Sequence, residues 1–411
     1  MITAIHDDLF ARDVINDPYS YFGHLREEDP VHWNEKYQVW IITRHADLVW
    51  ITRHPELFSS ELPMRPPPYP PIDASDLGLF EAIRKSQNQW FSNHDRPEHT
   101  AMRRVVHGYF TPTYVASWRP LVQSAIKDLL DAAEAQGGMD VMADFATPLP
   151  VLVIARLMGI PEADRPCIRQ WTTKLLFAER SLASDRMRHV AQGLQEFYAY
   201  LPPLIEERMI SPKEDLLSVL VSGEKQGVYT RDEVMSNAIL LLVAGHETTL
   251  NLLCNGILAF IQHPDQWQQL KQDPAGRAVR ATEECLRYDA PVKSLRRTAV
   301  EDVELHGKRI RQNDRIRWFI SAANRDPRVF PEPDQFNIAR DPNPHVAFGS
   351  GIHHCLGATL ARLEGQEAFK ALAQRFNELS LETEHLEYHP GNTFRSLVSL
   401  PVSWHSRSNW R

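Results

Sequence analysis

The chain has 411 residues, of which 43% are hydrophobic and 24% are charged. This composition is typical of a globular protein and excludes disordered, collagen-like and fibrous classes. The formal net charge of -8 argues against a general nucleic-acid-binding protein, because phosphate binding needs a basic face. The four cysteines lie far apart without a CxxC pair, which argues against a disulfide framework and fits a reducing cytoplasm.

The N-terminal stretch MITAIHDDLFARD is acidic and lacks the basic start and apolar core of a signal peptide. The longest aliphatic run, ILLLVAG at 239–245, is much shorter than a membrane span, which needs about 20 residues. We therefore expect a cytoplasmic protein with no membrane and no nucleic-acid partner.

The first predicted elements are short strands. VHW at 31–33 and QVWIIT at 38–43 flank a polar turn. The segment LPMRPPPYPP at 62–71 follows, and proline at this density excludes a helix or a central strand. It is either an interdomain linker or a stiff surface loop beside a ligand site.

Helical periodicity then dominates residues 97–290. Further strands are predicted where VEL and KRI flank His306-Gly307, and in SLVSLPVSW at 396–404. The fold class is therefore mainly α with small β-sheets. The predicted β-rich edge lies near residues 31–60 and 300–320.

The longest predicted helix has a capping box, because Thr230 and Glu233 form a T-x-x-E motif, and Pro264 ends it. Roughly thirty residues would span about 45 Å, so this helix must be buried over much of its length. Its middle reads AGHETT at 244–249. A buried carboxylate at Glu247 needs a partner, an altered protonation state or a water-filled cavity.

Two zinc-binding patterns fail on inspection. The pair HE at 246–247 lacks the second histidine of an HExxH motif, because that position is Leu250. The run HHC at 353–355 places three adjacent residues that rarely converge on one tetrahedral ion, and no other Cys/His cluster completes a set.

The loop FGSGIHHCLG at 348–357 contains Cys355 between glycines. A buried structural thiol is one explanation. However, small residues let a large flat cofactor approach the backbone, and a helix beginning near Leu356 points its N-terminal N–H groups at the sulfur. Coordination to a metal deprotonates a thiol, so a single sulfur in this setting suits an axial ligand of haem iron.

These motifs resemble those of the cytochrome P450 superfamily of haem-thiolate monooxygenases. The Cys355 loop matches the FGxGxHxCxG signature without departure, and ECLR at 284–287 matches ExxR. AGHETT and the stretch NRDPRVFPEPDQFNIAR at 324–340 match the distal helix and the meander. The resemblance implies a single catalytic domain over 1–411, with haem between a long distal helix and the proximal Cys loop.

The resemblance also implies the cofactor, haem b (iron protoporphyrin IX), with Cys355 as its metal ligand. His99 and Arg103 fall at i, i+4 on a helix that Asp95 is expected to cap, and they match the propionate contacts of the family. Arg297 matches a further contact, although Arg296 is an alternative. The expected cofactor-binding residues are His99, Arg103, Ala244, Gly245, Arg297, Phe348, Gly349, His353, Cys355 and Gly357.

By the same resemblance, Thr248 orders water at the oxygen-binding site and Glu247 links that water to solvent. A hydroxyl bond from Thr248 back to its own helix is the structural alternative. The expected substrate is a lipophilic small molecule, because the implied pocket is mainly apolar. The residues expected to line this substrate pocket are Trp90, Phe91, Leu240, Ser294, Leu295 and Phe394.

The sequence has no GxGxxG after a strand and no cluster-type cysteine spacing. Electrons are therefore expected to come from separate proteins, a ferredoxin and a ferredoxin reductase, with Arg103, Arg104 and Arg362 as the docking patch. The protein is also expected to be a monomer. Two alternatives to an O2-dependent monooxygenase are a peroxide-driven haem-thiolate peroxygenase and a non-catalytic haem sensor. The Glu247-Thr248 pair argues against both.

Overall fold

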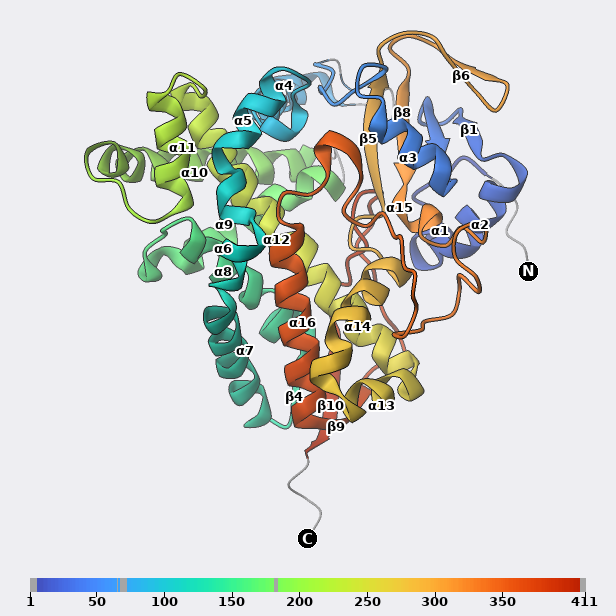
Figure 1. Ribbon diagram of the computed structural model, residues 1–411. Coiled ribbons are helices and arrows are strands. Elements are labelled where there is room, and N and C mark those ends of the chain that lie inside the picture. Colours follow the sequence, from blue (N-terminus) through green and yellow to red (C-terminus); the bar gives the residue numbers. More distant parts are fainter. Residues whose placement is uncertain (1–5, 65, 67–71, 181–183, 407–411) are drawn as a thin grey trace.

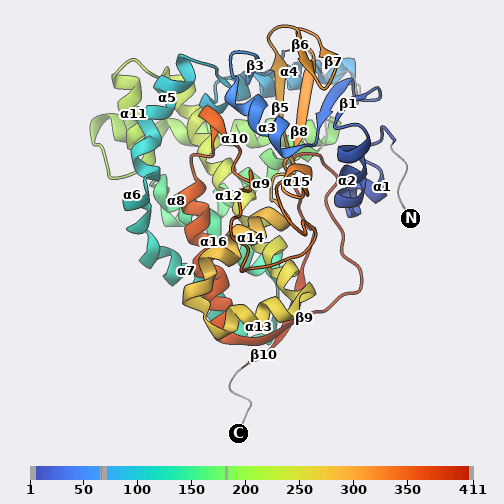
Figure 2. The same cartoon turned by 45° about the vertical axis from the view of Figure 1, so that its right-hand side comes forward.

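The computed structural model describes residues 6–64, 66, 72–180 and 184–406. Helices form most of this chain, and a smaller sheet-rich part lies at one side of them (Figure 1 and Figure 2). In chain order the helices are α1 (Arg12–Asn16), α2 (Pro18–Glu28), α3 (His45–Arg53), α4 (Leu77–Asn88), α5 (Glu98–His107), α6 (Pro112–Ala116), α7 (Arg119–Glu134), α8 (Pro148–Leu157), α9 (Arg165–Arg180), α10 (Ser184–Ile210), α11 (Leu216–Lys225), α12 (Arg231–Gln262), α13 (Pro264–Gln272), α14 (Pro274–Tyr288), α15 (Ile320–Ala323) and α16 (Ala358–Arg375).

The main sheet has five strands in the order β1-β2-β8-β5-β3 and lies beside α1, α2 and α3 (Figure 2). A three-stranded sheet in the order β4-β10-β9 lies at the far end of the helical body (Figure 1), and β6 pairs with β7 in a hairpin. The strands are β1 (Val31–Asn34), β2 (Val39–Ile42), β3 (Phe58–Ser59), β4 (Gly138–Asp140), β5 (Ser294–Ala299), β6 (Val303–Leu305), β7 (Lys308–Ile310), β8 (Arg315–Phe319), β9 (Phe376–Leu381) and β10 (Pro401–Ser406).

Helix α12 is the central element of the helical body. The predicted capping box is present, because the Thr230 side chain accepts from the Glu233 N–H and the Glu233 carboxylate accepts from the Thr230 N–H at 2.7 Å. By length and composition this helix could cross a membrane, but 78% of its most apolar window is buried within the protein. Its apolarity is therefore explained by a position in the protein core.

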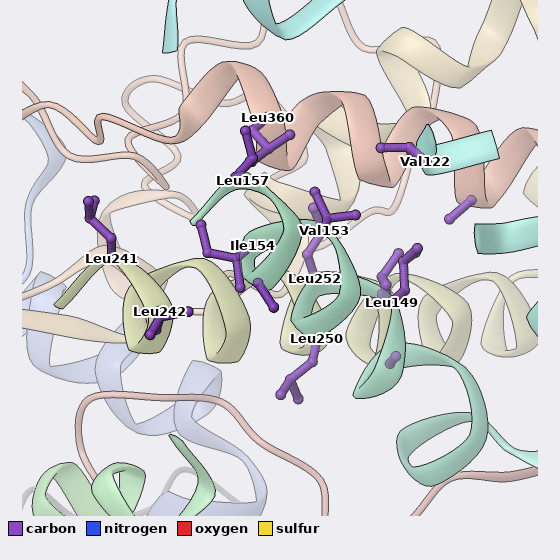
Figure 3. Packing of buried hydrophobic residues seen from close by; sticks show 14 of the residues in the cluster. Val122, Leu149, Val153, Ile154, Leu157, Leu241, Leu242, Leu250, Leu252 and Leu360 are labelled. Atoms are coloured by element: carbon purple, nitrogen blue, oxygen red, sulfur yellow. The ribbon is translucent and has the colours of Figure 1, made fainter. Parts of the chain in front are cut away.

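The interior forms where α8, α12 and α16 meet. Figure 3 shows apolar side chains of these helices filling the space between them. Burying one leucine side chain stabilises a fold by about 1.5 to 3 kcal/mol, so this contact holds α12 firmly against its neighbours. The labelled members on the three helices are Leu149, Val153, Ile154, Leu157, Leu241, Leu242, Leu250, Leu252 and Leu360, all buried.

The predicted strands largely agree with the structure. β1 and β2 match the expected strands near 31–43, and β6 and β7 flank His306-Gly307, where both φ angles are positive. The C-terminal strand is shorter than expected, because β10 begins at Pro401 while residues before it form only an isolated bridge at Leu397. Most of the proline-rich segment 62–71 lies outside the described residues.

Candidate functional site

A cavity of about 420 Å³ lies between α12, the loop 348–357, β5 and the segment around Phe394. Sequence reasoning expected these walls, and the structure brings nearly all the predicted residues together there. His99 lies outside the wall but contacts His353, with 4.1 Å between ring centroids. The predicted residues that line the cavity are Trp90, Phe91, Arg103, Leu240, Ala244, Gly245, Glu247, Thr248, Ser294, Leu295, Arg297, Phe348, Gly349, His353, Cys355, Gly357 and Phe394.

The Cys355 loop is a tight turn ahead of α16. The Cys355 N–H donates to the Phe348 carbonyl at 2.9 Å, and this bond closes the loop. Cys355 is exposed at the cavity wall. Gly357 is the N-cap of α16, and a Cβ built there meets nothing within 4 Å, so the backbone leaves open space beside the sulfur.

Two opposing effects act on the pKa of the Cys355 thiol. Desolvation raises its pKa, whereas the Gly357 N–H and the charges of Arg103 and Arg362 lower it. A thiol in this setting favours the thiolate only when a cation stands against the sulfur. Among the residues that the structure describes, no group of three or more His, Cys, Asp or Glu side chains could hold a metal ion. The single sulfur therefore fits an iron already held by a porphyrin, and does not fit a zinc site.

The loop depends on glycine at a second position. Gly351 has a φ of +70°, and a Cβ there would lie 2.0 Å from the Thr52 carbonyl oxygen of α3. Gly351→Ala should therefore lower the free energy of unfolding by at least about 2 kcal/mol, as measured by urea denaturation. The matched control is Gly78→Ala in α4, where the new methyl group meets nothing within 4 Å. Equal stability of the two variants would contradict the prediction.

Cationic side chains gather at one edge of the cavity. Arg297 is half-buried against the Trp318 ring, and Arg103 donates to the His354 carbonyl at 2.6 Å. Burial and the neighbouring arginines lower the pKa of His99 to about 4 and that of His353 to about 2.

His99 is buried, and its two ring nitrogens have no hydrogen-bond partner within the described part of the chain. Buried polar atoms normally have hydrogen-bond partners. The positive charges of the nearby arginines also disfavour protonation of His99 and His353. A dianionic group placed beside this edge would satisfy both requirements. The residues therefore fit the two propionates of a haem.

Arg296 and Arg297 were alternative candidates for contact with a propionate, and side-chain alternation along β5 distinguishes them. The two residues alternate on β5, so their side chains leave opposite faces of the sheet. Arg297 lowers the pKa of both His99 and His353, which puts its charge on the histidine side.

Asp95 does not cap α5. Pro97 stands at the N-cap position, and the Asp95 carboxylate instead accepts from the Ser60 N–H at 2.9 Å and the Ser59 hydroxyl at 2.5 Å. Ser59 of β3 and the adjacent Ser60 take up the carboxylate, so Asp95 connects the end of β3 to the start of α5.

The polar middle of α12 faces the same cavity. The Thr248 hydroxyl donates to the Ala244 carbonyl at 2.9 Å, which is the back-bond expected as the structural alternative. Glu247 is 1% exposed and accepts from Asn251 at 3.4 Å. Gly245 borders the cavity, and its missing side chain lets Ile154 of α8 approach, since a Cβ would lie 2.9 Å from Ile154.

The apolar side of the cavity is held in place by contacts to α12 and to the segment just before β5. The amide of Asn237 accepts from the Phe91 N–H at 2.8 Å and donates to the Gln89 carbonyl at 2.8 Å, which holds Trp90-Phe91 against α12. Phe394 forms a bridge with Val292 just before β5. These contacts make the predicted apolar residues one continuous wall.

The ExxR pair is fully buried beneath the site. Arg287 donates to both Glu284 oxygens at 2.8 Å, and both side chains are 0% exposed. Further N–H groups of Arg287 donate to the carbonyls of Asn324, Pro333 and Gln335. The pair thus connects α14 to the meander.

The three arginines expected as a docking patch differ in their surroundings. Arg104 is exposed on α5. Arg362 is engaged with Glu283 at 2.8 Å and lies over the Phe348 ring, while Arg103 turns toward His354. Of the three, Arg104 is exposed, whereas Arg103 and Arg362 contact neighbouring groups of the protein.

Sequence reasoning missed two charged residues of the cavity wall, Arg317 and Glu364. Glu364 is 1% exposed, and burial raises its pKa to about 8. The signal for Glu364 was its place in α16, the helix that directly follows the Cys355 loop. The signal for Arg317 was RIRW at 315–318, where arginines alternate with apolar residues as on a strand with one polar face.

Comparisons with known proteins agree with this geometry. The sequence profile of the family Cytochrome P450 matches residues 279–401. The biotin biosynthesis cytochrome P450 of Bacillus subtilis is 35% identical over 402 residues, which are 96% of this chain and 98% of the relative. The cytochrome P450 monooxygenase PikC of Streptomyces venezuelae is 36% identical over 404 residues, which are 96% and 92% of the two chains.

Solved structures agree equally well. P450BioI in complex with hexadec-9Z-enoic acid ligated acyl carrier protein has a TM-score of 0.88 and 35% identity, and covers 96% of this chain and 100% of that chain. Myxobacterial CYP267B1 in complex with myristic acid has a TM-score of 0.87 and 34% identity, and covers 97% and 99%. Given this similarity over nearly the whole length, the chain belongs to the cytochrome P450 family and is an oxygen-incorporating oxidoreductase that binds haem b.

Proposed function

We propose that the protein inserts one oxygen atom from O2 into a lipophilic small molecule, by hydroxylation or epoxidation. The observation that carries this proposal is that one mainly apolar cavity is lined by both the Cys355 thiol and the acid-alcohol pair Glu247-Thr248. When bound, haem supplies the activation of O2. The chain's own residues hold the cofactor, orient the substrate and move protons.

Cys355 would hold the iron, and the charged Arg103 and Arg297, together with the neutral side chains of His99 and His353, would hold the propionates. Arg–carboxylate contacts in a mostly buried setting offset the desolvation of both charges. The apolar residues of the opposite wall exclude bulk water and leave the substrate to be oriented by few polar contacts.

Thr248 and Glu247 would carry the proton supply. The Thr248 hydroxyl uses its hydrogen on the Ala244 carbonyl, so its oxygen is left to accept from a water in the cavity. Glu247 lines the cavity one residue earlier, and its carboxyl is suited to pass protons to that water. The back-bond and the catalytic role are therefore compatible.

We further propose a cytoplasmic, monomeric enzyme that receives electrons from a ferredoxin and its reductase. Support for a separate donor comes from the sequence, which contains neither a dinucleotide motif nor cluster-type cysteines. The ligands named for two structural neighbours are an acyl chain on a carrier protein and myristic acid, and they favour an acyl-chain substrate.

Thr248→Ala is expected to uncouple the enzyme. Haem content and the substrate-induced spin shift should stay nearly intact, because Thr248 is neither the expected iron ligand nor one of the residues expected to hold the propionates. Nicotinamide oxidation should continue while hydrogen peroxide accumulates in place of oxygenated product. Glu247→Gln should slow the proton-dependent step by about 10²-fold, as for a typical general acid.

The measurement is product, peroxide and nicotinamide consumption in one reaction with ferredoxin and reductase. Asn251→Ala is not a suitable control because it contacts Glu247, whereas Thr173→Ala on α9 removes an exposed hydroxyl with a similar back-bond. Unchanged coupling in both test variants would remove the pair from the mechanism. Faster turnover of the wild type with peroxide alone would favour the peroxygenase alternative.

A further inference from the structure

We propose that Glu283 and Arg362 form a balanced charge pair beside the Cys355 loop and thereby set the reduction potential of the iron. Both are positioning residues, because they act through the loop and do not touch the substrate. Their role rests on the proposed ligation of iron by Cys355. It goes beyond the proposed function by naming the groups that tune this ligand.

The pair joins two neighbouring helices. Glu283 lies on α14 and Arg362 on α16, and these helices lie side by side in both views (Figure 1 and Figure 2). The Arg362 Nε donates to one Glu283 oxygen at 2.8 Å, and a terminal nitrogen donates to the other at 2.9 Å. A bidentate contact of this kind fixes the plane and the direction of a guanidinium. Arg362 is therefore held in one orientation relative to the loop.

Arg362 acts on the loop by contact and by charge. Its guanidinium lies over the Phe348 ring, 4.4 Å from the ring centroid, and the Phe348 carbonyl accepts from the Cys355 N–H at 2.9 Å. Burial raises the pKa of the Cys355 thiol, and Arg362 is among the groups that lower it, after the Gly357 N–H and Arg103. The positive charge of Arg362 thus reaches the sulfur.

Glu283 has a second partner in the chain just before the loop. The His345 side chain is 2% exposed, and its Nε2 lies 3.0 Å from the Glu283 Oε2. The Ala347 N–H donates to the His345 Nδ1 at 3.3 Å, so the proton of the neutral ring is on Nε2 and faces the carboxylate. His345 therefore adds a hydrogen bond without adding a charge.

Glu283 is ionised at neutral pH. Burial raises the pKa of its carboxyl, but the hydrogen bonds from His345 and Arg362 outweigh burial and lower the pKa to about 2. One negative charge and one positive charge therefore balance each other beside Cys355. Both side chains are partly shielded from solvent, with 33% of Arg362 and 24% of Glu283 exposed, so water screens their charges only in part.

This balance matters because reduction of the iron adds one negative charge beside the sulfur. A positive charge nearby stabilises the reduced form, and a negative charge destabilises it. While both members of the pair are present, their effects largely cancel. Removal of either member leaves the other to act alone, so the two removals should have opposite effects.

The test is a potentiometric titration of the substrate-free holoenzyme, without any redox partner. Glu283→Gln removes the negative charge, so the reduction potential should rise. Arg362→Gln leaves the carboxylate unbalanced, so the potential should fall. Each shift should change the ferric-to-ferrous ratio at a fixed potential by about tenfold, which is about 59 mV for one electron. The double variant should return close to the wild-type potential, because both charges are absent.

Arg375→Gln is the matched control. Arg375 lies on the same helix about 20 Å further along, and it also pairs with carboxylates, those of Asp131 and Glu134. Loss of this charge should leave the potential unchanged. Arg362→Lys and Glu283→Asp keep both charges of the pair, so they should keep the ferric-to-ferrous ratio within about twofold of wild type.

Opposite shifts separate an electrostatic role from a structural one. If the pair only held the loop in shape, either Gln variant would loosen the same loop, and both potentials would move in the same direction. Shifts of equal sign, or no shift in either variant, would overturn the inference. Where Arg362→Gln does not retain haem, Glu283→Gln decides alone, and a potential that does not rise would overturn it.

Failure of this inference is distinguishable from failure of the proposed function. Wild-type protein that gives the red-shifted Soret band of thiolate ligation, with equal potentials in all variants, would keep Cys355 as the iron ligand and lose only the role of the pair. Wild-type protein without this band would contradict the ligand assignment and the proposed function themselves.

Discussion

Cys355→His is expected to abolish the red-shifted Soret band that thiolate ligation gives to the ferrous carbon monoxide complex, together with most oxygen activation. A neutral imidazole donates less electron density to iron than a thiolate, and this density favours O–O cleavage. The loop around Cys355 is closed by the bond from its N–H to the Phe348 carbonyl, so the substitution changes the ligand with little change in the backbone.

Carbon monoxide difference spectra and product formation measure this effect. Cys167→Ser is the control, because Cys167 is an exposed free cysteine on α9 and lies outside the cavity wall. This control variant should keep the wild-type spectrum. A Cys355→His protein with native spectrum and activity would show that another residue holds the iron.

Arg287→Ala should have the largest effect on stability. The substitution leaves the Glu284 carboxylate uncompensated and removes the N–H donors from three meander carbonyls. Breaking one side of a buried ion pair costs about 3 to 5 kcal/mol, so low soluble yield and poor haem retention are expected. Urea unfolding and haem content of the purified protein measure the result.

A surface ion pair on the same helix provides the control. Arg280 pairs with Asp341 at 2.9 Å, and the two side chains are 58% and 66% exposed. Arg280→Ala should lower stability by no more than about 1 kcal/mol, because exposed pairs contribute little. Similar losses in the two variants would mean that burial of Glu284-Arg287 has no special energetic role.

Features specified by local sequence were predicted well. The α12 capping box, the turn at His306-Gly307 and the i, i+3 pairing of Glu284 with Arg287 all involve residues within one turn of each other. Cys355 and Glu247 line the same cavity, as predicted, because each belongs to a long motif whose place in the fold could be inferred.

Features that depend on distant segments were predicted poorly. Asp95 fits a helix cap by local rules, but its carboxylate accepts hydrogen bonds from Ser59 in β3 and from Ser60, the residue after that strand. The pairing of Arg296 with Arg317 depends on the β5–β8 register, which spacing along the chain does not determine. The direction of the Thr248 hydroxyl was left open, since a back-bond and a ligand-facing hydroxyl have the same sequence.

The order of strands in the small sheet has a consequence for the time course of folding. β10 is the central strand between β4 and β9, yet it follows both along the chain. Asp140 at the end of β4 accepts from the Leu400 N–H, 260 residues further on. Such nonlocal pairing costs loop-closure entropy before the contact can stabilise the fold, and this cost slows folding. A chain emerging from the ribosome would therefore expose the edges of β4 until residues 401–406 arrive, and aggregation during synthesis should be most sensitive to substitutions in β10.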